Sequence, residues 1–96
     1  MQIIRTYSTG VFAGDLDEST RSADGKRGIV RNARRLWKWS GAASLSDMAI
    51  NGVSNPTGCK FPAPVEYIEL MEIIEVLPCT EQAVRSISEV PVWTMH

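Results

Sequence analysis

Glycines and prolines punctuate this chain so densely that they leave room mainly for short elements joined by turns. Seven glycines and five prolines are distributed over 96 residues, and both residue types interrupt regular structure. A chain of this length makes one domain, because two separate cores would each be too small to fold independently. We therefore expect a single domain over residues 1–96 with a modest core.

The N-terminal half predicts an antiparallel meander of three strands. Residues 2–8 are rich in β-branched and aromatic side chains, and a second apolar run at 11–16 follows a Thr-Gly turn, which is typical of a β-hairpin. The polar stretch 15–26 contains an Asp-Gly turn signal and predicts a hairpin loop. Residues 28–39 have no breaker after their first glycine and predict a long third strand.

The C-terminal half predicts two short helices. Ser44 is a good N-cap for a helix over 45–51, which Gly52 would end. The segment 53–64 contains three prolines and predicts an extended loop. Thr80 can cap a second helix of about ten residues with an apolar stripe on one side.

The segment 65–77 is ambiguous, because its glutamates recur at every third position, at 66, 69, 72 and 75. That spacing fits neither a clean strand nor a clean helix. Flanking prolines and β-branched residues favour a strand, so we predict one strand over 65–77. The whole chain is then an α+β domain with an antiparallel sheet of four or five strands and two short helices.

Charge is segregated along the chain although it nearly cancels, with a net charge of −1. Residues 26–38 carry six cations and no acid, whereas residues 61–96 carry six glutamates and one arginine. Such segregation suits a self-complementary oligomer or an anion-binding face beside an acidic one. The overall acidity argues against a protein that coats DNA.

The cationic segment also contains tryptophans, which gives it a pattern typical of nucleotide binding. Arginine forks bind phosphate, and indole faces stack on bases. In an uninterrupted strand one face would present Arg31, Arg35, Trp37 and Trp39, and the other Asn32, Arg34 and Lys38. The alternative is that the tryptophans are core residues and the cations form a solvated or glutamate-paired face.

Three further places offer a cation to a ligand, each with a structural alternative. Lys60 and Phe61 follow a Gly-Cys pair in a proline-rich loop, which either closes over an anionic ligand or simply connects two elements. Arg85 is alone on an acidic and apolar helix, where pairing with a glutamate is the alternative. Arg5, on the apolar first strand, either contacts a ligand or protects a sheet edge.

The sequence offers no catalytic or metal-binding signature. It contains no nucleophile-elbow, P-loop, zinc-protease or dinucleotide-binding motif. The single histidine, His96, argues against a histidine-based metal or acid–base centre, and Cys59 and Cys79 are interpreted as free, buried thiols. We expect a non-enzymatic protein without cofactors. No apolar run is long enough to span a membrane and no signal peptide is recognisable, so we expect a cytoplasmic protein.

Several strings in the chain resemble a family of small phage-encoded proteins, the Thoeris anti-defence sponges. They are RTYSTGVF at 5–12, ARRLWKW at 33–39, GAASLS at 41–46, GCKFP at 58–62, and PCTE with a closing VPVW. The resemblance covers most of the chain. It implies a binder that sequesters the glycocyclic ADP-ribose signal of bacterial TIR-domain enzymes, and also cyclic oligonucleotides, without chemical change.

The resemblance also implies the site residues and the assembly. Arg5 and Arg85 match the arginines of a pocket for glycocyclic ADP-ribose at a dimer interface. Arg34 and Lys60 match a second pocket for cyclic oligonucleotides in larger assemblies, up to a hexamer, and Arg35 is a substitute for Arg34. The sponge would act in the cytoplasm of an infected bacterium. The alternative from another class is a structural or scaffolding phage protein that has no small-molecule ligand and uses its tryptophan-rich and glutamate-rich strands as oligomer surfaces.

Overall fold

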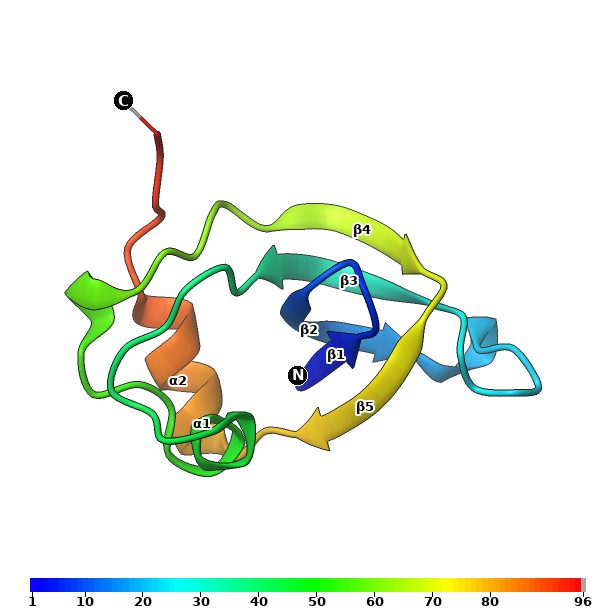
Figure 1. The fold of residues 1–96 in the computed structure, drawn as a ribbon, viewed down its shortest axis with the longest axis horizontal. Helices are drawn as coiled ribbons and strands as arrows, with labels where there is room; N and C mark the ends of the chain where they lie inside the picture. The colour runs from blue at the N-terminus through cyan, green and yellow to red at the C-terminus, as the bar shows by residue number, and fades with distance from the viewer. Residues whose placement is uncertain (96) are drawn as a thin grey trace.

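The structure is a computed structural model that describes residues 1–95; His96 lies outside the described residues. One five-stranded antiparallel sheet, ordered β4-β3-β2-β1-β5, packs with two short helices (Figure 1). The predicted α+β class is confirmed. The elements are β1 (Gln2–Thr6), β2 (Val11–Asp17), η1 (Glu18–Thr20), β3 (Gly28–Arg35), α1 (Leu45–Asn51), η2 (Pro56–Gly58), β4 (Val65–Leu70), β5 (Ile73–Pro78) and α2 (Glu81–Glu89).

Local signals placed the meander and both helices correctly. Strands β1, β2 and β3 pair antiparallel in sequence order. The Ser44 hydroxyl accepts a hydrogen bond from the Asp47 amide at 3.1 Å, and the Thr80 hydroxyl accepts one from the Ala83 amide at 3.1 Å. Each cap satisfies an amide that lacks a partner within the first helical turn, which is why these hydroxyls start the helices.

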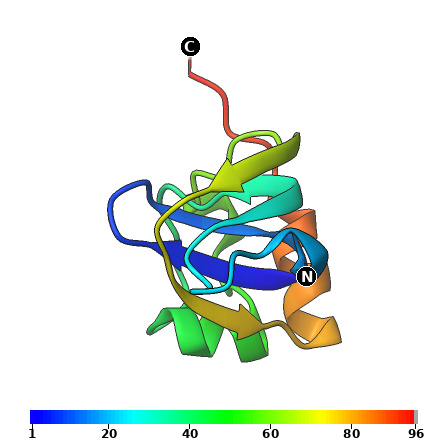
Figure 2. The same ribbon diagram turned by 90° about the vertical axis from the view of Figure 1, so that its right-hand side faces the viewer.

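The sheet is strongly curled. Strands β4 and β5 lie at its opposite edges, yet only Met71 and Glu72 separate them in the chain. The amide of Tyr7 donates to the Glu72 carbonyl at 3.0 Å, and the amide of Ile73 donates to the Lys26 carbonyl at 2.8 Å. Figures 1 and 2 show the chain sweeping from β4 to β5 through this bend, so the two edges meet at one end of the sheet.

The prediction of strand rather than helix over 65–77 is confirmed, but a single strand is wrong, because the segment forms two strands that join at the bend. On β4, Ile68 and Leu70 alternate into the interior of the curl. Continued alternation would bring Glu72 inside, but Ile73 is the next buried residue. The phase of the apolar pattern changes because the chain passes from one sheet edge to the other.

Both faces of the sheet are covered around β1, where Ile3 and Ile4 point to opposite sides and both have no exposed surface. The interior of the curl is filled from all five strands, by Ile4, Phe12, Val30, Ala33, Leu70 and Ile73. The opposite face packs under the helices, in a core that includes Ile3, Ala13, Leu36, Met48, Phe61 and Ile87. These two cores hold the candidate site residues in place.

The predicted strand over 28–39 ends earlier, at Arg35, and contains a bulge. The pairing of β2 with β3 shifts between Ala13 and Asp15, and Asn32 on β3 has a positive φ of 49°. A side chain at Gly14 could not fit here, because its Cβ would lie 2.7 Å from a Val30 methyl group. Glycine at this position thus lets the two strands approach closely at the bulge.

The bulge overturns the expected sharing of faces on β3. Arg31 pairs with Asp15 and Arg35 pairs with Phe12. Asp15 and Phe12 lie three residues apart on β2 and therefore on opposite faces, so Arg31 and Arg35 do too. Beyond Arg35 the chain leaves the ladder and touches the β4 side again through an isolated bridge between Lys38 and Lys60.

Candidate functional site

Arg34 ties the sheet to the C-terminal end of α2 and is only 7% exposed. Its guanidinium donates four hydrogen bonds to backbone carbonyls: to Pro62 at 2.9 Å, Phe61 at 3.0 Å, Ile87 at 3.0 Å and Val90 at 2.7 Å. Carbonyls at a helix C-terminus have no partner inside the helix. Arg34 supplies a side-chain donor to the Ile87 and Val90 carbonyls, the first of which also accepts from the Val90 amide. Desolvation by burial lowers the pKa of the Arg34 guanidinium. Four of its five N–H groups are thereby withheld from a ligand.

Phe61 and Lys60 lie next to Arg34 but differ in accessibility. The Phe61 ring is completely buried, with the Arg34 guanidinium 5.5 Å from its centre, so it supports Arg34 and offers no face to a base. The Lys60 side chain is exposed, and its ammonium lies 5.4 Å from the centre of the Trp93 ring. Lys60 therefore remains accessible to an anion, whereas Phe61 does not.

Arg5 is held in the sheet by an ion pair. Its Nε donates to a Glu75 carboxylate oxygen at 3.1 Å, and the two residues are directly opposite on β1 and β5. The side chains are 46% and 37% exposed, so a pair of this kind contributes about 0–1 kcal/mol to stability. An anionic ligand would face a carboxylate beside this arginine.

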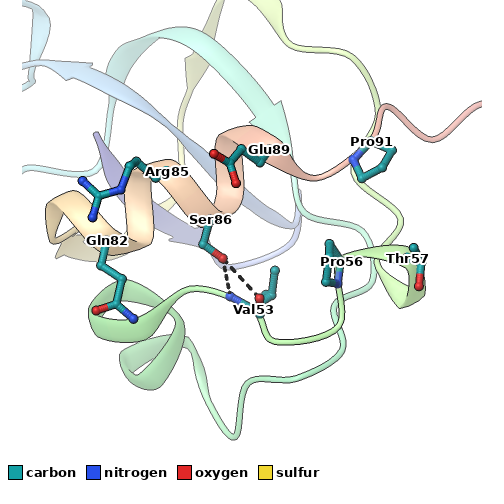
Figure 3. A pocket seen from close by; sticks show the side chains of 8 residues that line it. All are labelled: Val53, Pro56, Thr57, Gln82, Arg85, Ser86, Glu89 and Pro91. Carbon is teal, nitrogen blue, oxygen red and sulfur yellow. Dashed lines mark hydrogen bonds between the residues drawn. The ribbon is translucent and has the colours of Figure 1, made fainter.

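Arg85 lines an open hollow of about 450 Å³ on the outer side of α2. Figure 3 shows its neighbours Gln82, Ser86 and Glu89 along the helix, across from residues 53–57. Ser86 is engaged with the backbone of Val53, accepting from its amide at 2.9 Å and donating to its carbonyl at 3.2 Å. Within residues 1–95, no hydrogen bond or ion pair occupies the Arg85 guanidinium.

Arg35 borders a different hollow, of about 430 Å³, together with Trp37 and Trp39. Its guanidinium stacks 4.4 Å from the centre of the Phe12 ring and donates one hydrogen bond, to the Thr9 carbonyl at 2.5 Å. The predicted strand face shared by Arg31, Arg35, Trp37 and Trp39 is wrong, because β3 ends at Arg35 and Arg31 lies on the opposite face. Arg35, Trp37 and Trp39 nevertheless line the same hollow.

The six predicted residues thus fall into four places. Arg34, Lys60 and Phe61 are neighbours around the end of α2. Arg35, Arg5 and Arg85 each lie elsewhere, and in the described part of the chain no hydrogen bond joins Arg5 to Arg85. Sequence reasoning missed Gln82 and Glu89, which flank Arg85 in its hollow. The signal was present: positions 82, 85, 86 and 89 recur at helical spacing, beside the buried stripe of Ala83 and Ile87.

The described residues offer little for metal or thiol chemistry. Within residues 1–95, no group of three or more histidine, cysteine or acidic side chains is placed to hold a metal ion. Cys59 is buried, Cys79 is half-buried, and both are free. Burial raises the pKa of the Cys79 thiol, which lowers its thiolate fraction and so its reactivity. Among the described residues, no helix has the length and apolarity needed to cross a membrane.

Comparison with known proteins identifies a family. Searches of curated proteins and of solved structures return no significant match. A family of domains of unknown function, DUF6948, matches residues 2–87, which include the whole sheet, α1 and most of α2. The chain belongs to the DUF6948 family.

Proposed function

We propose that this domain binds a cyclic nucleotide-type immune signal and sequesters it without changing it chemically. The observation that carries the proposal is Arg85, whose guanidinium has no partner among residues 1–95 and borders an open hollow of about 450 Å³. Hollows that bind small molecules commonly have this size. A guanidinium that is free of internal partners can donate two parallel hydrogen bonds to a phosphate.

The residues around Arg85 suit the remainder of such a ligand. Gln82 offers both a donor and an acceptor, and the Glu89 carboxylate can accept hydrogen bonds from ribose hydroxyls. Pro56 and Pro91 add apolar surface at low entropic cost. A pyrophosphate-linked ligand with two riboses needs this combination, which supports a signal of the glycocyclic ADP-ribose type.

Self-association completes the proposal. Arg5 and Arg85 do not contact each other within one chain, whereas a dimer would allow Arg5 of one copy to approach the Arg85 hollow of the other. The resemblance to the Thoeris sponges supports this arrangement, the phage origin and action in the cytoplasm of an infected bacterium. Larger assemblies, up to a hexamer, and a second ligand of the cyclic oligonucleotide class belong to the same proposal.

Calorimetry with cyclic ADP-ribose isomers tests the proposal. We expect one isomer to bind, and Arg85→Gln to weaken it about 10- to 100-fold, because losing a hydrogen bond to a charged group costs about 1.5–3 kcal/mol. Arg27→Gln, an exposed cation outside this hollow, is the matched control and should bind normally. Chromatography of the released ligand should recover it unchanged. Equal affinities for the Arg85→Gln variant and the parent protein would contradict the site.

A scaffolding role is the second candidate, and a specific surface favours it. Tyr67 and Val65 on β4, with Met71 at the bend and Ile74 on β5, are each half exposed or more. Contiguous exposed apolar surface marks contacts between proteins, and Met71 and Ile74 line one hollow together. The same calorimetry separates the two functions, because a scaffold would bind none of the cyclic ADP-ribose isomers.

A further inference from the structure

Two consecutive arginines on β3 have opposite surroundings, and the second is left with unused donors. Arg34 donates four hydrogen bonds to carbonyls, whereas Arg35 donates one, to the Thr9 carbonyl at 2.5 Å. A guanidinium has five N–H groups. Four of those of Arg35 therefore have no acceptor among the described residues, although the group is only partly exposed.

The β1–β2 turn and the interior of the sheet fix the Arg35 guanidinium in place. The group stacks 4.4 Å from the centre of the buried Phe12 ring. Gly10 has a positive φ of 116°, and a Cβ there would lie 3.1 Å from Nη1 of Arg35. Glycine thus leaves the space that the guanidinium fills, and the unused donors are preorganised at low cost in side-chain entropy.

Aromatic surface borders the same hollow as Arg35. Trp37 and Trp39 line the same hollow of about 430 Å³, and Trp37 is 60% exposed. The Trp37 indole is braced by Trp93, whose ring stands at 89° to it with centres 5.1 Å apart. The ammonium of Lys60 lies over Trp93 in turn. An exposed indole held in a fixed orientation is suited to stacking.

The hollow is electrostatically biased toward anions. Its described lining residues include the Arg35 cation and no acidic side chain. The apolar walls of the hollow can hold a planar ring by shape complementarity alone. A guanidinium beside that ring favours a ligand with a negatively charged substituent. The surroundings therefore match a molecule that joins an aromatic ring to an anionic group.

We propose that the hollow lined by Arg35, Trp37 and Trp39 binds the base and phosphate of a nucleotide, as a site separate from the Arg85 hollow. The base stacks on Trp37, and the phosphate accepts hydrogen bonds from the free N–H groups of Arg35. The inference rests on the proposed function for its ligand class only. It places the anion contact of the β3 segment at Arg35, because Arg34 is occupied by carbonyls.

Indole N–H resonances provide the test, with adenosine monophosphate, adenosine and inorganic phosphate as probes. Single tryptophan-to-phenylalanine variants assign the three signals. We expect the monophosphate to shift the Trp37 and Trp39 signals, adenosine to do so at least tenfold more weakly, and phosphate to leave them unmoved. Arg35→Gln should bring the affinity for the monophosphate down to that for adenosine, and Trp37→Ala should abolish binding of both.

Arg27→Gln, an exposed cation outside both hollows, is the matched control and should bind the monophosphate normally, with Arg35→Gln melting within a few degrees of the parent protein. The inference is overturned if millimolar monophosphate moves neither indole signal, if adenosine binds the parent protein equally well, or if Arg27→Gln removes the shifts. Failure of the proposed function looks different: cyclic ADP-ribose isomers would not bind in calorimetry, while the monophosphate would still shift Trp37 and Trp39.

Discussion

Arg34 is the single residue on which the packing of α2 against the sheet depends most. Replacing it with alanine removes four hydrogen bonds and leaves the Pro62 and Val90 carbonyls without a donor among the described residues, whereas the Phe61 and Ile87 carbonyls still accept from backbone amides. An unsatisfied buried polar group costs about 1–3 kcal/mol, so with two such groups we expect Arg34→Ala to lower the free energy of unfolding by about 2–6 kcal/mol. Denaturant unfolding followed by circular dichroism measures the change.

Arg31→Ala is the control for that measurement, since Arg31 forms an exposed ion pair with Asp17 at 3.2 Å. A pair of this type contributes about 0–1 kcal/mol. Arg34→Lys should be intermediate, because a lysine keeps the charge but has three donors and lacks the planar fork. If Arg34→Ala and Arg31→Ala had the same free energy of unfolding, the hydrogen bonds of Arg34 would not stabilise the packing of α2 against β3.

The sequence alone does not predict that Arg34 is buried and engaged with carbonyls while its neighbour Arg35 is partly exposed. Arg34 and Arg35 belong to one cationic run, and strand alternation alone cannot tell which faces the helices when a bulge resets it at Asn32. The bulge depends on pairing with Gly14, fourteen or more residues away across a polar loop. By contrast, Arg35, Trp37 and Trp39 meet around one hollow because they are close in sequence, and strand alternation does not explain it, since β3 ends at Arg35.

At the level of elements, the α1 N-terminus carries a pH-sensitive contact. Hydrogen bonds from the Ala43 amide and the Asn51 side chain lower the pKa of Asp47 below its ordinary value of 3.8. A carboxyl with a depressed folded-state pKa stabilises the fold fully above its unfolded value, and this contribution disappears as pH falls through the lower, folded value. We therefore expect acid to weaken α1.

The comparison of Asp47→Asn with the parent protein tests this. Thermal melts at pH 6 should show the variant to be less stable, since an amide oxygen accepts these bonds more weakly than a carboxylate. The difference in melting temperature between the two proteins should disappear as the pH falls below 3.8, because the Asp47 carboxylate of the parent protein is then protonated and loses its charge. A difference that stays constant down to pH 2.5 would mean that the Asp47 charge does not stabilise α1.

Elements with local signals were predictable, and the one that depended on the whole sheet was not. Both helices begin after a serine or threonine N-cap that can be recognised in the sequence, and the turn of the first hairpin contains a Thr-Gly pair. The bend at Met71–Glu72 has no glycine, proline or asparagine to mark it. Only the change of apolar phase between Leu70 and Ile73 indicates it, and interpreting that change requires knowing that the sheet curls.

At the scale of the whole molecule, we predict a homo-oligomer with a dimer as its smallest unit. A chain of 96 residues buries a smaller share of its surface than larger domains do, so association adds useful apolar burial. Cations concentrate in residues 26–38 and glutamates in residues 61–96, and closed two-fold symmetry can place such regions of two copies against each other.

Attraction between exposed charges is screened by salt. Light scattering at high micromolar concentration should therefore return at least twice the 10.6 kDa of one chain at moderate salt, with dissociation favoured as salt rises. A mass of 10.6 kDa at moderate salt would rule out the dimer and, with it, any site that needs Arg5 of a second copy beside Arg85.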